Sequence, residues 1–457
     1  MTAPAAPRSL VLIGAGSAVF TRGLLADLIS APDLGAWNLR LCDTNPDALR
    51  VAERLARRMV EARDASDRVS VRASTDRCDL LPGADLVVVS VGVGGRPAWL
   101  LDWQIAADEG IFQPVGDSVM PGGVSRGLRT IPVMVAIAQD VARLAPDALF
   151  FNYGNPMTAN VAAMRRHAGA EVVGLCHGVM HVQHELARFI RVPVERTSSL
   201  YCGLNHLTFI YDLRVDGRDA WPLARARLAE ERAQPFDADA VGQIWQDGSK
   251  AAMNPFSWEL FERFGAYPAA SDRHTTEFFP ARFGRGAYYG KTLGVDAHPL
   301  HEILEWGEQR YQTMRREAEG SEPLDESIFD RSSGDQEQLI DIIRSIDGDT
   351  RRTFSVNVPN EGAVPAMPRG AVLEIPGIAT ARGLRAMTVP DLPAPIAAVL
   401  TARLAAVDLL IEAALTGRRD LVIETLLADG AVTDPAQAGR LSDRYLEAQA
   451  RYLPNFA

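Results

Sequence analysis

The segment Ser9-Leu-Val-Leu-Ile-Gly14-Ala-Gly-Ser17-Ala-Val-Phe20 joins a short apolar run to two glycines and then to a helical pattern that continues to about Ile29. A continuous apolar run that ends in glycines is typical of a buried strand followed by a tight turn. The segment therefore predicts a strand, a turn and a helix in direct succession.

The same alternation recurs further along the chain. Apolar runs at 37–43, 85–91 and 148–153 are separated by helical patterns. Strands that alternate with helices favour a parallel sheet that is covered on both faces. We predict an α/β protein with a doubly wound (Rossmann) parallel sheet in residues 1–194. An α+β domain is expected in residues 195–457, where the alternation weakens.

Composition and charge narrow the classes of partner. The chain has 457 residues, of which 47% are hydrophobic and 23% charged, as in an ordinary globular protein. Its formal net charge of −11 repels phosphate backbones, and no segment dense in lysine and arginine compensates for it. We therefore expect no nucleic-acid partner, whereas a small anionic substrate could still bind in a local basic pocket.

The number of cysteines and the N-terminal sequence indicate the cellular compartment of the protein. The N-terminus lacks a charged stretch followed by an apolar one, so we expect no signal peptide. Four cysteines in a chain of this length are too few for a secreted disulfide framework, which indicates a reducing compartment, namely the cytoplasm. These cysteines are Cys42, Cys78, Cys176 and Cys202.

One apolar segment, 396–415, has the length of a membrane span. It carries Arg403, Asp408 and Glu412, which are costly inside a bilayer. We expect a helix of a soluble protein that ends at Gly417, and no membrane partner.

Gly14 and Gly16 lie between the first strand and the first helix, where backbone can approach a pyrophosphate and helix amides can hold its charge. Val19 stands where the full fingerprint has its third glycine. Asp43 closes the second strand and could bind both ribose hydroxyls while repelling a 2′-phosphate. The pattern favours NAD over NADP; alternatively, the glycines form only a turn and Asp43 only ends a strand.

Two candidate metal ligands follow strand-like runs. Cys176 is one, and His206 in Gly203-Leu-Asn-His is the other. A thiolate with an imidazole suits manganese, iron, cobalt or zinc. From spacing alone, a buried thiol and a hydrogen-bonded histidine are equally open, and His177 with His181 could form a helical pair instead.

The run Ser271-Asp272-Arg273-His274-Thr-Thr-Glu277 gathers a possible base with possible anion-binding groups. A charged run of this kind could also be a solvated surface.

The Gly/Pro-rich loop 114–123 contains Asp117 and is followed by Arg126, which suits contact with a ligand. An ordinary connection to a helix is the alternative.

Several motifs taken together resemble the NAD-dependent glycoside hydrolases of family 4, which do not use the usual pair of carboxylates. The resemblance covers nearly the whole chain and rests on ordered motifs. They are Gly14-Ala-Gly-Ser, Val115-Gly-Asp-Ser, Gly127-Leu-Arg-Thr-Ile-Pro, Asn152-Tyr-Gly-Asn-Pro-Met, Gly174-Leu-Cys-His-Gly, Gly203-Leu-Asn-His and Val356-Asn-Val-Pro-Asn-Glu-Gly-Ala-Val-Pro.

The resemblance implies a redox-elimination mechanism. NAD takes a hydride from C3 of the sugar, a base removes the acidified C2 proton, and a divalent metal, expected to be manganese, stabilises the resulting charge. The aglycone leaves C1, water adds, and NADH returns its hydride, so the cofactor is not consumed.

The resemblance also implies roles for individual residues. Cys176 and His206 match the metal ligands, Asn155 contacts the sugar, and His177 stands where some members carry a general acid. Many members place a tyrosine base near positions 267–277; here Asp272 is the expected base, with Tyr267 in reserve. The residues expected to contact the cofactor are Gly14, Gly16, Ser17, Phe20, Asp43 and Asn152.

The Cys-His motif resembles that of α-glycosidases acting on unphosphorylated sugars, and the Asp-Arg-His motif resembles that of enzymes cleaving α-uronides. Arg126, Arg273 and His274, with Asp117 nearby, are expected to bind an anionic sugar, either an α-uronide or a sulfoquinovoside. The alternatives are a neutral α-glucoside or α-galactoside hydrolase, a dehydrogenase of the lactate/malate type, and a noncatalytic redox sensor. Family resemblance further implies a homo-oligomer, a dimer or a tetramer.

Overall fold

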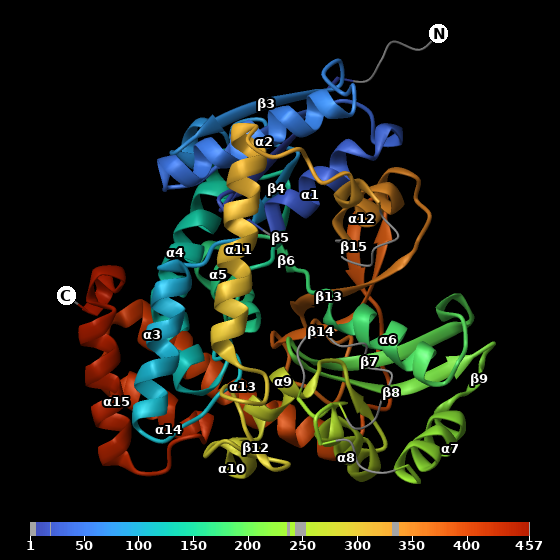
Figure 1. Ribbon diagram of the computed structural model, residues 1–457, viewed down its shortest axis with the longest axis vertical. Helices are drawn as coiled ribbons and strands as arrows, with labels where there is room; N and C mark the ends of the chain where they lie inside the picture. Colours follow the sequence, from blue (N-terminus) through green and yellow to red (C-terminus); the bar gives the residue numbers. More distant parts are fainter. Residues whose placement is uncertain (1–5, 19, 235–237, 243–252, 331–337, 457) are drawn as a thin grey trace.

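The computed structural model describes residues 6–18, 20–234, 238–242, 253–330 and 338–456. Val19 therefore lies outside the described residues. The remainder forms a mixed α/β protein around one large sheet (Figure 1).

The N-terminal part of the sheet is parallel, with the strand order β3-β2-β1-β4-β5-β6. Leu10, Val11 and Leu12 of the first strand are fully buried, as expected for a parallel strand with helices on both faces. The prediction of a doubly wound parallel sheet is confirmed. The strands are β1 (Arg8–Ile13), β2 (Trp37–Cys42), β3 (Val69–Ser74), β4 (Leu86–Val89), β5 (Leu149–Asn152) and β6 (Val172–Gly174).

Helices connect these strands and cover them. α2 begins with Pro46 directly after Asn45, whose side chain accepts hydrogen bonds from the free amides of the first turn. The helices are α1 (Phe20–Ile29), α2 (Pro46–Ala62), α3 (Gly95–Asp108), α4 (Met120–Leu144), α5 (Met157–Ala168) and α6 (Gly178–Phe189).

Antiparallel strands from the C-terminal part extend the same sheet. β13 pairs with β6, and the order then continues β14-β7-β8-β10, with β15 on β14 and β9 on β8. β7 and β8 form an antiparallel hairpin. The strands are β7 (Thr197–Leu204), β8 (Leu207–Val215), β9 (Arg218–Asp219), β10 (Tyr267–Pro268), β13 (Thr353–Pro359), β14 (Val372–Thr380) and β15 (Gly383–Ala386); β11 (Ala287–Tyr288) and β12 (Lys291–Thr292) form a separate pair.

A buried glutamate ties the antiparallel strands together next to this junction. Glu374 of β14 accepts hydrogen bonds from the Thr208 hydroxyl at 2.6 Å and from the Asn357 amide at 3.0 Å. Burial raises the pKa of the Glu374 carboxyl, and these donors oppose the shift. The expected boundary after residue 194 stays a prediction, because strands from both sides of it share one sheet.

The C-terminal helices return to the parallel part of the molecule, where α15 lies beside α3 and α13 packs on α4 (Figure 1). By length and composition α13 could span a membrane, alone among the helices of the described ranges. Instead it packs against other helices, and the Arg403 guanidinium donates hydrogen bonds to the carbonyl oxygens of Phe278 and Asp429. It ends at Gly417, as predicted, with φ of +68°.

The remaining helices surround the antiparallel part, except for α11, which runs alongside α3 and reaches α2 (Figure 1). The C-terminal helices are α13 (Ala394–Thr416), α14 (Arg419–Asp429) and α15 (Pro435–Ala448), and the others are α7 (Trp221–Arg232), α8 (Pro255–Phe264), α9 (Asp272–Thr275), α10 (Pro280–Phe283), α11 (Leu300–Glu319) and α12 (Gln338–Asp347).

Candidate active site

Gly14 and Gly16 form a tight turn at the carboxyl end of β1. Gly14 has φ of +91°, and a Cβ there would lie 2.2 Å from the carbonyl oxygen of Ser90 at the end of β4. The Gly16 amide donates a hydrogen bond of 2.8 Å to Oδ2 of Asp43. Only glycine fits the first position, and the turn leaves backbone open at the site where a parallel sheet of this kind binds a dinucleotide.

Asp43 lies at the end of β2 and is partly exposed. Its second oxygen, Oδ1, accepts from the Asn45 amide at 2.9 Å. A carboxylate oxygen has two lone pairs, so both oxygens can still accept a ribose hydroxyl. The negative charge in this position disfavours a 2′-phosphate.

The other residues expected to contact the cofactor make different contacts within the chain. The Ser17 amide donates to the Gly14 carbonyl within the turn, and the Phe20 ring lies 4.4 Å from that of Tyr153. The Asn152 side chain is fully buried and exchanges two hydrogen bonds with the Gly154 backbone, at 2.9 and 3.0 Å. Asn152 therefore shapes the loop after β5, and this geometry argues against a direct contact between its amide and the cofactor.

Three side chains from distant segments form a candidate metal centre. The donor atoms of Asp117, His206 and His274 all lie within 4.8 Å of one another. Oδ1 of Asp117 is 3.8 Å from Nδ1 of His206, and the two imidazole rings are 3.9 Å apart. Nδ1 of His274 is buried and has no hydrogen-bond partner among the described residues. One carboxylate and two imidazoles suit a divalent ion such as Mn²⁺.

The electrostatics of the three groups agree with metal binding. Burial lowers the pKa of both His206 and His274, so each neutral ring presents a lone pair. Burial also opposes ionisation of Asp117, but the neighbouring imidazoles and the Arg126 guanidinium outweigh it and hold its pKa below the usual range. Arg126 is the neighbour that stays charged when both rings are neutral, and its guanidinium then favours the ionised form of Asp117.

Local backbone geometry presents His206 to this centre. It is the second residue of the two-residue turn between β7 and β8, with φ of +67°, a value uncommon outside glycine. The turn carries the imidazole beyond the end of the hairpin, and the Ser118 hydroxyl lies 3.5 Å from its Nδ1. The strand pairing thus fixes one donor of the centre.

The loop that carries Asp117 is held by two carboxylates from other elements. Oε1 of Glu277 accepts from the amides of Val115 and Gly116, both at 2.8 Å. On the other side, Oδ2 of Asp429 accepts from the amide of Met120, whose φ is +60°. Sequence reasoning gave neither carboxylate this role, because their partners lie more than a hundred residues away in the chain.

Two buried guanidinium groups adjoin the centre. Nε of Arg126 donates to the Asn155 carbonyl at 3.3 Å, and its guanidinium carbon lies 5.6 Å from the centre of the Trp99 ring. The Asn155 amide donates to Oδ2 of Asp117 at 2.9 Å. Arg273 is buried beside His274, and burial lowers its pKa while the Asp117 charge opposes that change. The structure thus gathers all five residues expected to contact the substrate.

Cys176 is not part of the three-residue donor group. It follows β6, where its Sγ accepts from the Gly178 amide at 3.4 Å and its carbonyl accepts from Gln338 at 2.8 Å. His177 is exposed at the N-terminus of α6. Of the two residues predicted as metal ligands, His206 lies in the three-residue donor group with Asp117 and His274, and Cys176 as a ligand stays a prediction.

The geometry argues against Asp272 as a base. It is fully buried, and its two oxygens accept four hydrogen bonds: from the Phe256 amide, the Ser257 amide and hydroxyl, and the Tyr288 hydroxyl. Burial raises its pKa and these donors oppose the shift. With all its lone pairs used, this carboxyl anchors the start of α8.

Tyr267, the reserve base, is also a core residue. It is 6% exposed, its ring packs 4.8 Å from that of Trp258, and burial raises its pKa well above the usual value. The predictions of Asp272 and Tyr267 as bases fail for the same reason, because a short run of sequence does not reveal that a segment is packed inward.

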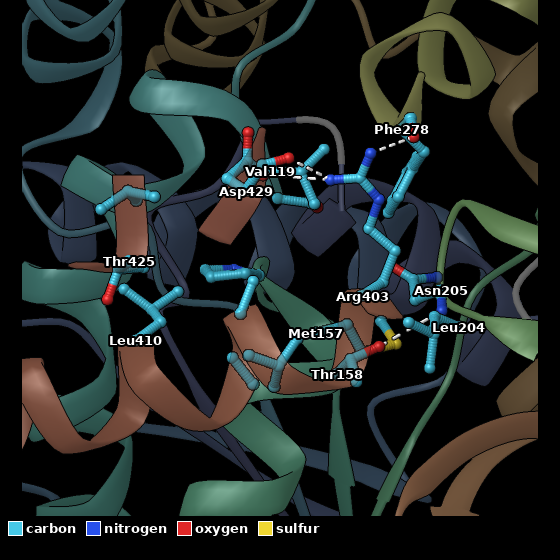
Figure 2. Close-up of a pocket in the computed structure, with 16 residues that line it drawn as sticks. Val119, Met157, Thr158, Leu204, Asn205, Phe278, Arg403, Leu410, Thr425 and Asp429 are labelled. Atoms are coloured by element: carbon cyan, nitrogen blue, oxygen red, sulfur yellow. Dashed lines mark hydrogen bonds and ion pairs between the residues drawn. The ribbon is translucent and has the colours of Figure 1, made fainter. Parts of the chain in front are cut away.

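Figure 2 shows a mostly apolar cavity. Ser118 and Asn205, the neighbours of two donors, contribute to its wall. Figure 2 shows the Arg403 side chain extended between Phe278 and Asp429 at one end. Arg403 therefore links α13 to the carboxylate that holds the Asp117 loop.

Solved structures with this fold include NAD-binding glycosidases. The chain superposes on the crystal structure of LplD from Bacillus subtilis with a TM-score of 0.84 and 26% identity, covering 96% of this chain and 100% of that one. A 6-phospho-α-glucosidase from gut microorganisms, in complex with NAD and Mn²⁺, matches with a TM-score of 0.81, 20% identity and coverage of 99% and 100%. At that identity the second likeness concerns the fold.

Curated relatives are similar over nearly their whole length. The chain is 31% identical to an α-glucosidase of Erwinia rhapontici, covering 97% of this chain and 98% of that protein. It is 27% identical to an α-galacturonidase of Bacillus subtilis (strain 168), covering 96% of each.

Sequence profiles place the two parts of the chain in one family. Residues 9–192 match the profile described as family 4 glycosyl hydrolase, and residues 201–432 match the C-terminal domain of the same family. Together these matches span most of the chain and both halves of the sheet. The protein is a member of the family 4 glycosyl hydrolases.

Proposed function

We propose that this glycoside hydrolase is an α-glycosidase that depends on NAD and a divalent metal and acts on a sugar carrying an anionic group. An α-uronide and a sulfoquinovoside are the two candidate classes. The observation that carries this proposal is the burial of Arg126 and Arg273 directly beside the donors Asp117, His206 and His274.

The residues present fit both cofactors. Gly14 and Gly16 admit a pyrophosphate, and Asp43 can accept the ribose hydroxyls. Asp117 and His274 join His206 in holding the metal. When bound, NAD would accept and return a hydride at C3, and the metal would polarise the sugar oxygens next to the proton that is removed.

The arginines supply the selectivity for an anion. A guanidinium favours a ligand with a carboxylate or sulfonate, because hydrogen bonds between ionised partners are the strong ones. Arg126 and Arg273 both lie within electrostatic reach of Asp117, so they place two positive groups next to the donor residues. The similarity to an α-galacturonidase supports a uronide.

We retain His177 as the proposed general acid. Its side chain is exposed at the carboxyl end of β6, the edge of the sheet at which the dinucleotide turn also lies. A histidine in this position can protonate a leaving aglycone near neutral pH. Asp272 and Tyr267 are not retained as bases, because both are enclosed in the core.

A neutral α-glucoside is the second candidate substrate, favoured by the 31% identity to an α-glucosidase. Chromogenic α-galacturonide, α-glucuronide, α-sulfoquinovoside and α-glucoside, each incubated with enzyme, NAD and Mn²⁺, distinguish the candidates by their kcat/KM. We expect an anionic substrate to be preferred and NADH not to accumulate. A preference for the α-glucoside would contradict the anionic class.

The elimination step has its own test. Product formed in heavy water should carry deuterium at C2, because the proton removed there is replaced by one from solvent when water adds. Product without deuterium at C2 would rule out proton abstraction there. NADH released in proportion to product would instead indicate a dehydrogenase of the lactate/malate type.

We further propose a cytoplasmic homo-oligomer. None of the four cysteines forms a disulfide, which agrees with a reducing compartment. The C-terminal helix α13 offers an apolar surface that is only partly buried, with 33% of its most hydrophobic window enclosed. Sedimentation of the purified protein with NAD and Mn²⁺ measures the assembly, and a monomer would contradict this proposal.

A further inference from the structure

His298 is a buried histidine that the candidate site has not yet accounted for. Its side chain is 2% exposed, and neither Nδ1 nor Nε2 has a hydrogen-bond partner among the described residues. A buried polar atom without a partner costs about 1–3 kcal/mol. Two such atoms on one ring indicate that a group outside the described residues supplies the partners.

The backbone at His298 is also unusual. Its φ is +53°, a left-handed conformation that costs about 1 kcal/mol or more for a residue with a Cβ. The His298 amide donates to the Gly242 carbonyl at 2.9 Å, and the following Pro299 caps α11. Backbone strain of this kind tends to be kept where it aims a side chain at a ligand.

The ring lies in the neighbourhood of the candidate site. It is 6.0 Å from the ring of Tyr288 and within electrostatic reach of His274 and Arg273 on α9. Burial, followed by the charges of Arg273 and Lys291, lowers the pKa of His298 to about 3. The imidazole is therefore neutral near pH 7 and offers one N–H donor and one acceptor.

The identity of the missing partner follows from these neighbours. His298 is not in the metal-donor group, so a metal ion does not account for its nitrogens. The guanidinium of Arg273 provides a positive charge within electrostatic reach of the ring. An N–H donor beside a guanidinium suits an acceptor-only anionic group, and the second nitrogen suits a sugar hydroxyl.

We propose that His298 is a substrate-binding residue that donates a hydrogen bond to the acidic group of the sugar, beside Arg273. This inference rests on the proposed function and assigns a residue that selects its substrate class. A carboxylate and a sulfonate present the same acceptor oxygens, so the experiment includes both.

The test uses the full-length protein loaded with NAD and Mn²⁺. Binding of galacturonate, glucuronate, sulfoquinovose and galactose is measured by calorimetry for wild type, His298→Ala, His298→Gln and His301→Ala. His301 is the matched control, because it is an exposed histidine of α11 whose ring contacts only Trp103 among the described aromatic side chains. Thermal unfolding and NAD affinity are measured on the same samples.

We expect His298→Ala to weaken binding of the preferred acidic sugar by about tenfold or more, in the range for a lost hydrogen bond to a charged group. Galactose binding, NAD affinity and the thermal midpoint should change little, His298→Gln should be intermediate, and His301→Ala should resemble wild type. A structural role would lower the thermal midpoint and leave the ratio of acidic to neutral sugar affinity unchanged.

The outcomes separate the two proposals. If wild type prefers acidic sugars and His298→Ala retains the same preference and affinity, the role of His298 is overturned and the proposed function stands. If wild type binds galactose better than every acidic sugar, the proposed substrate class fails and the assignment of His298 to an acidic group fails with it.

Discussion

Asp117, His206 and His274 come from three separate segments, whereas sequence reasoning paired His206 with Cys176. We predict that His274→Ala weakens Mn²⁺ binding by about tenfold or more, since it removes a ligand rather than a supporting group. Cys176→Ser should have less than about a threefold effect, because this thiol lies outside the donor group. Electron paramagnetic resonance of Mn²⁺ with NAD-loaded protein gives both affinities, with Cys78→Ser as the control. A larger loss of Mn²⁺ affinity in Cys176→Ser than in His274→Ala would identify the Cys176 thiolate as a ligand.

Glu277 makes stability depend on pH in a defined direction. Burial and the nearby Asp117 raise its pKa from 4.5 to about 8. A carboxyl with a raised pKa binds protons more tightly in the folded chain, so the stability it contributes is present at low pH and is lost as the pH rises towards 8.

The variant Glu277→Gln isolates this effect, because its amide oxygen can still accept from both loop amides. Between pH 5 and 8, metal-free wild type should lose stability relative to this variant by up to about 1.4 kcal/mol per pH unit. Urea unfolding in the presence of a chelator measures the difference. A difference that is constant, or that grows in favour of wild type with pH, would contradict the pKa assigned to Glu277.

Individual site residues could be predicted from the sequence only where their neighbours in the chain determine their role. Gly14 and Gly16 follow an apolar run directly, and their conformational requirement could be read from that context. Asp117 and His274 are far apart in the chain, and nothing within either segment indicates that the two meet. The inward packing of Asp272 was hidden for the same reason.

At the scale of elements, Asp272 stabilises α8 from outside that helix. It accepts from the amides of Phe256 and Ser257 in the first turn, where helix amides lack internal partners. We predict that Asp272→Ala lowers the free energy of unfolding by about 2–4 kcal/mol, as for a lost cap combined with unsatisfied buried donors.

Urea unfolding of Asp272→Ala and of the surface variant Asp147→Ala tests this role; Asp147 is exposed, and its replacement should change stability by less than about 0.5 kcal/mol. The folded fraction of Asp272→Ala should keep kcat within about tenfold of wild type, because removal of a general base would cost 10²–10⁴-fold. Unchanged stability with a loss of activity beyond that range would identify Asp272 as the base after all.

The elements themselves were more predictable than their pairing. Apolar runs predicted β1, β2 and β5, and Gly417 predicted the end of α13. The partners of β13 were not predictable, because its pairing with β6 joins Asn357 to Gly174 across the whole middle of the chain. Strand pairing at that separation depends on tertiary packing rather than on local pattern.

At the scale of the whole molecule, the two matched parts of the family share one sheet and one core. Residues of α13, α14 and α15 pack in the same apolar cluster as β1 and β4. We predict that residues 1–194 expressed alone do not reach a native fold, because they lack both β13 and these helices. Circular dichroism and proton NMR of that fragment should show little tertiary structure, while full-length protein unfolds in one transition. A fragment with dispersed NMR signals would demonstrate an independent N-terminal domain.

The change from parallel to antiparallel pairing at β6 and β13 has a consequence for the history of such enzymes. Parallel strands present only their carboxyl ends to the cofactor edge, whereas an antiparallel hairpin can bring a turn, here that of His206, to the same place. An ancestral nucleotide-binding sheet could therefore acquire new chemistry by adding hairpins at its free edge without altering the turn at Gly14. Divergence among descendants should then concentrate in the added strands, and the cofactor turn should change slowest.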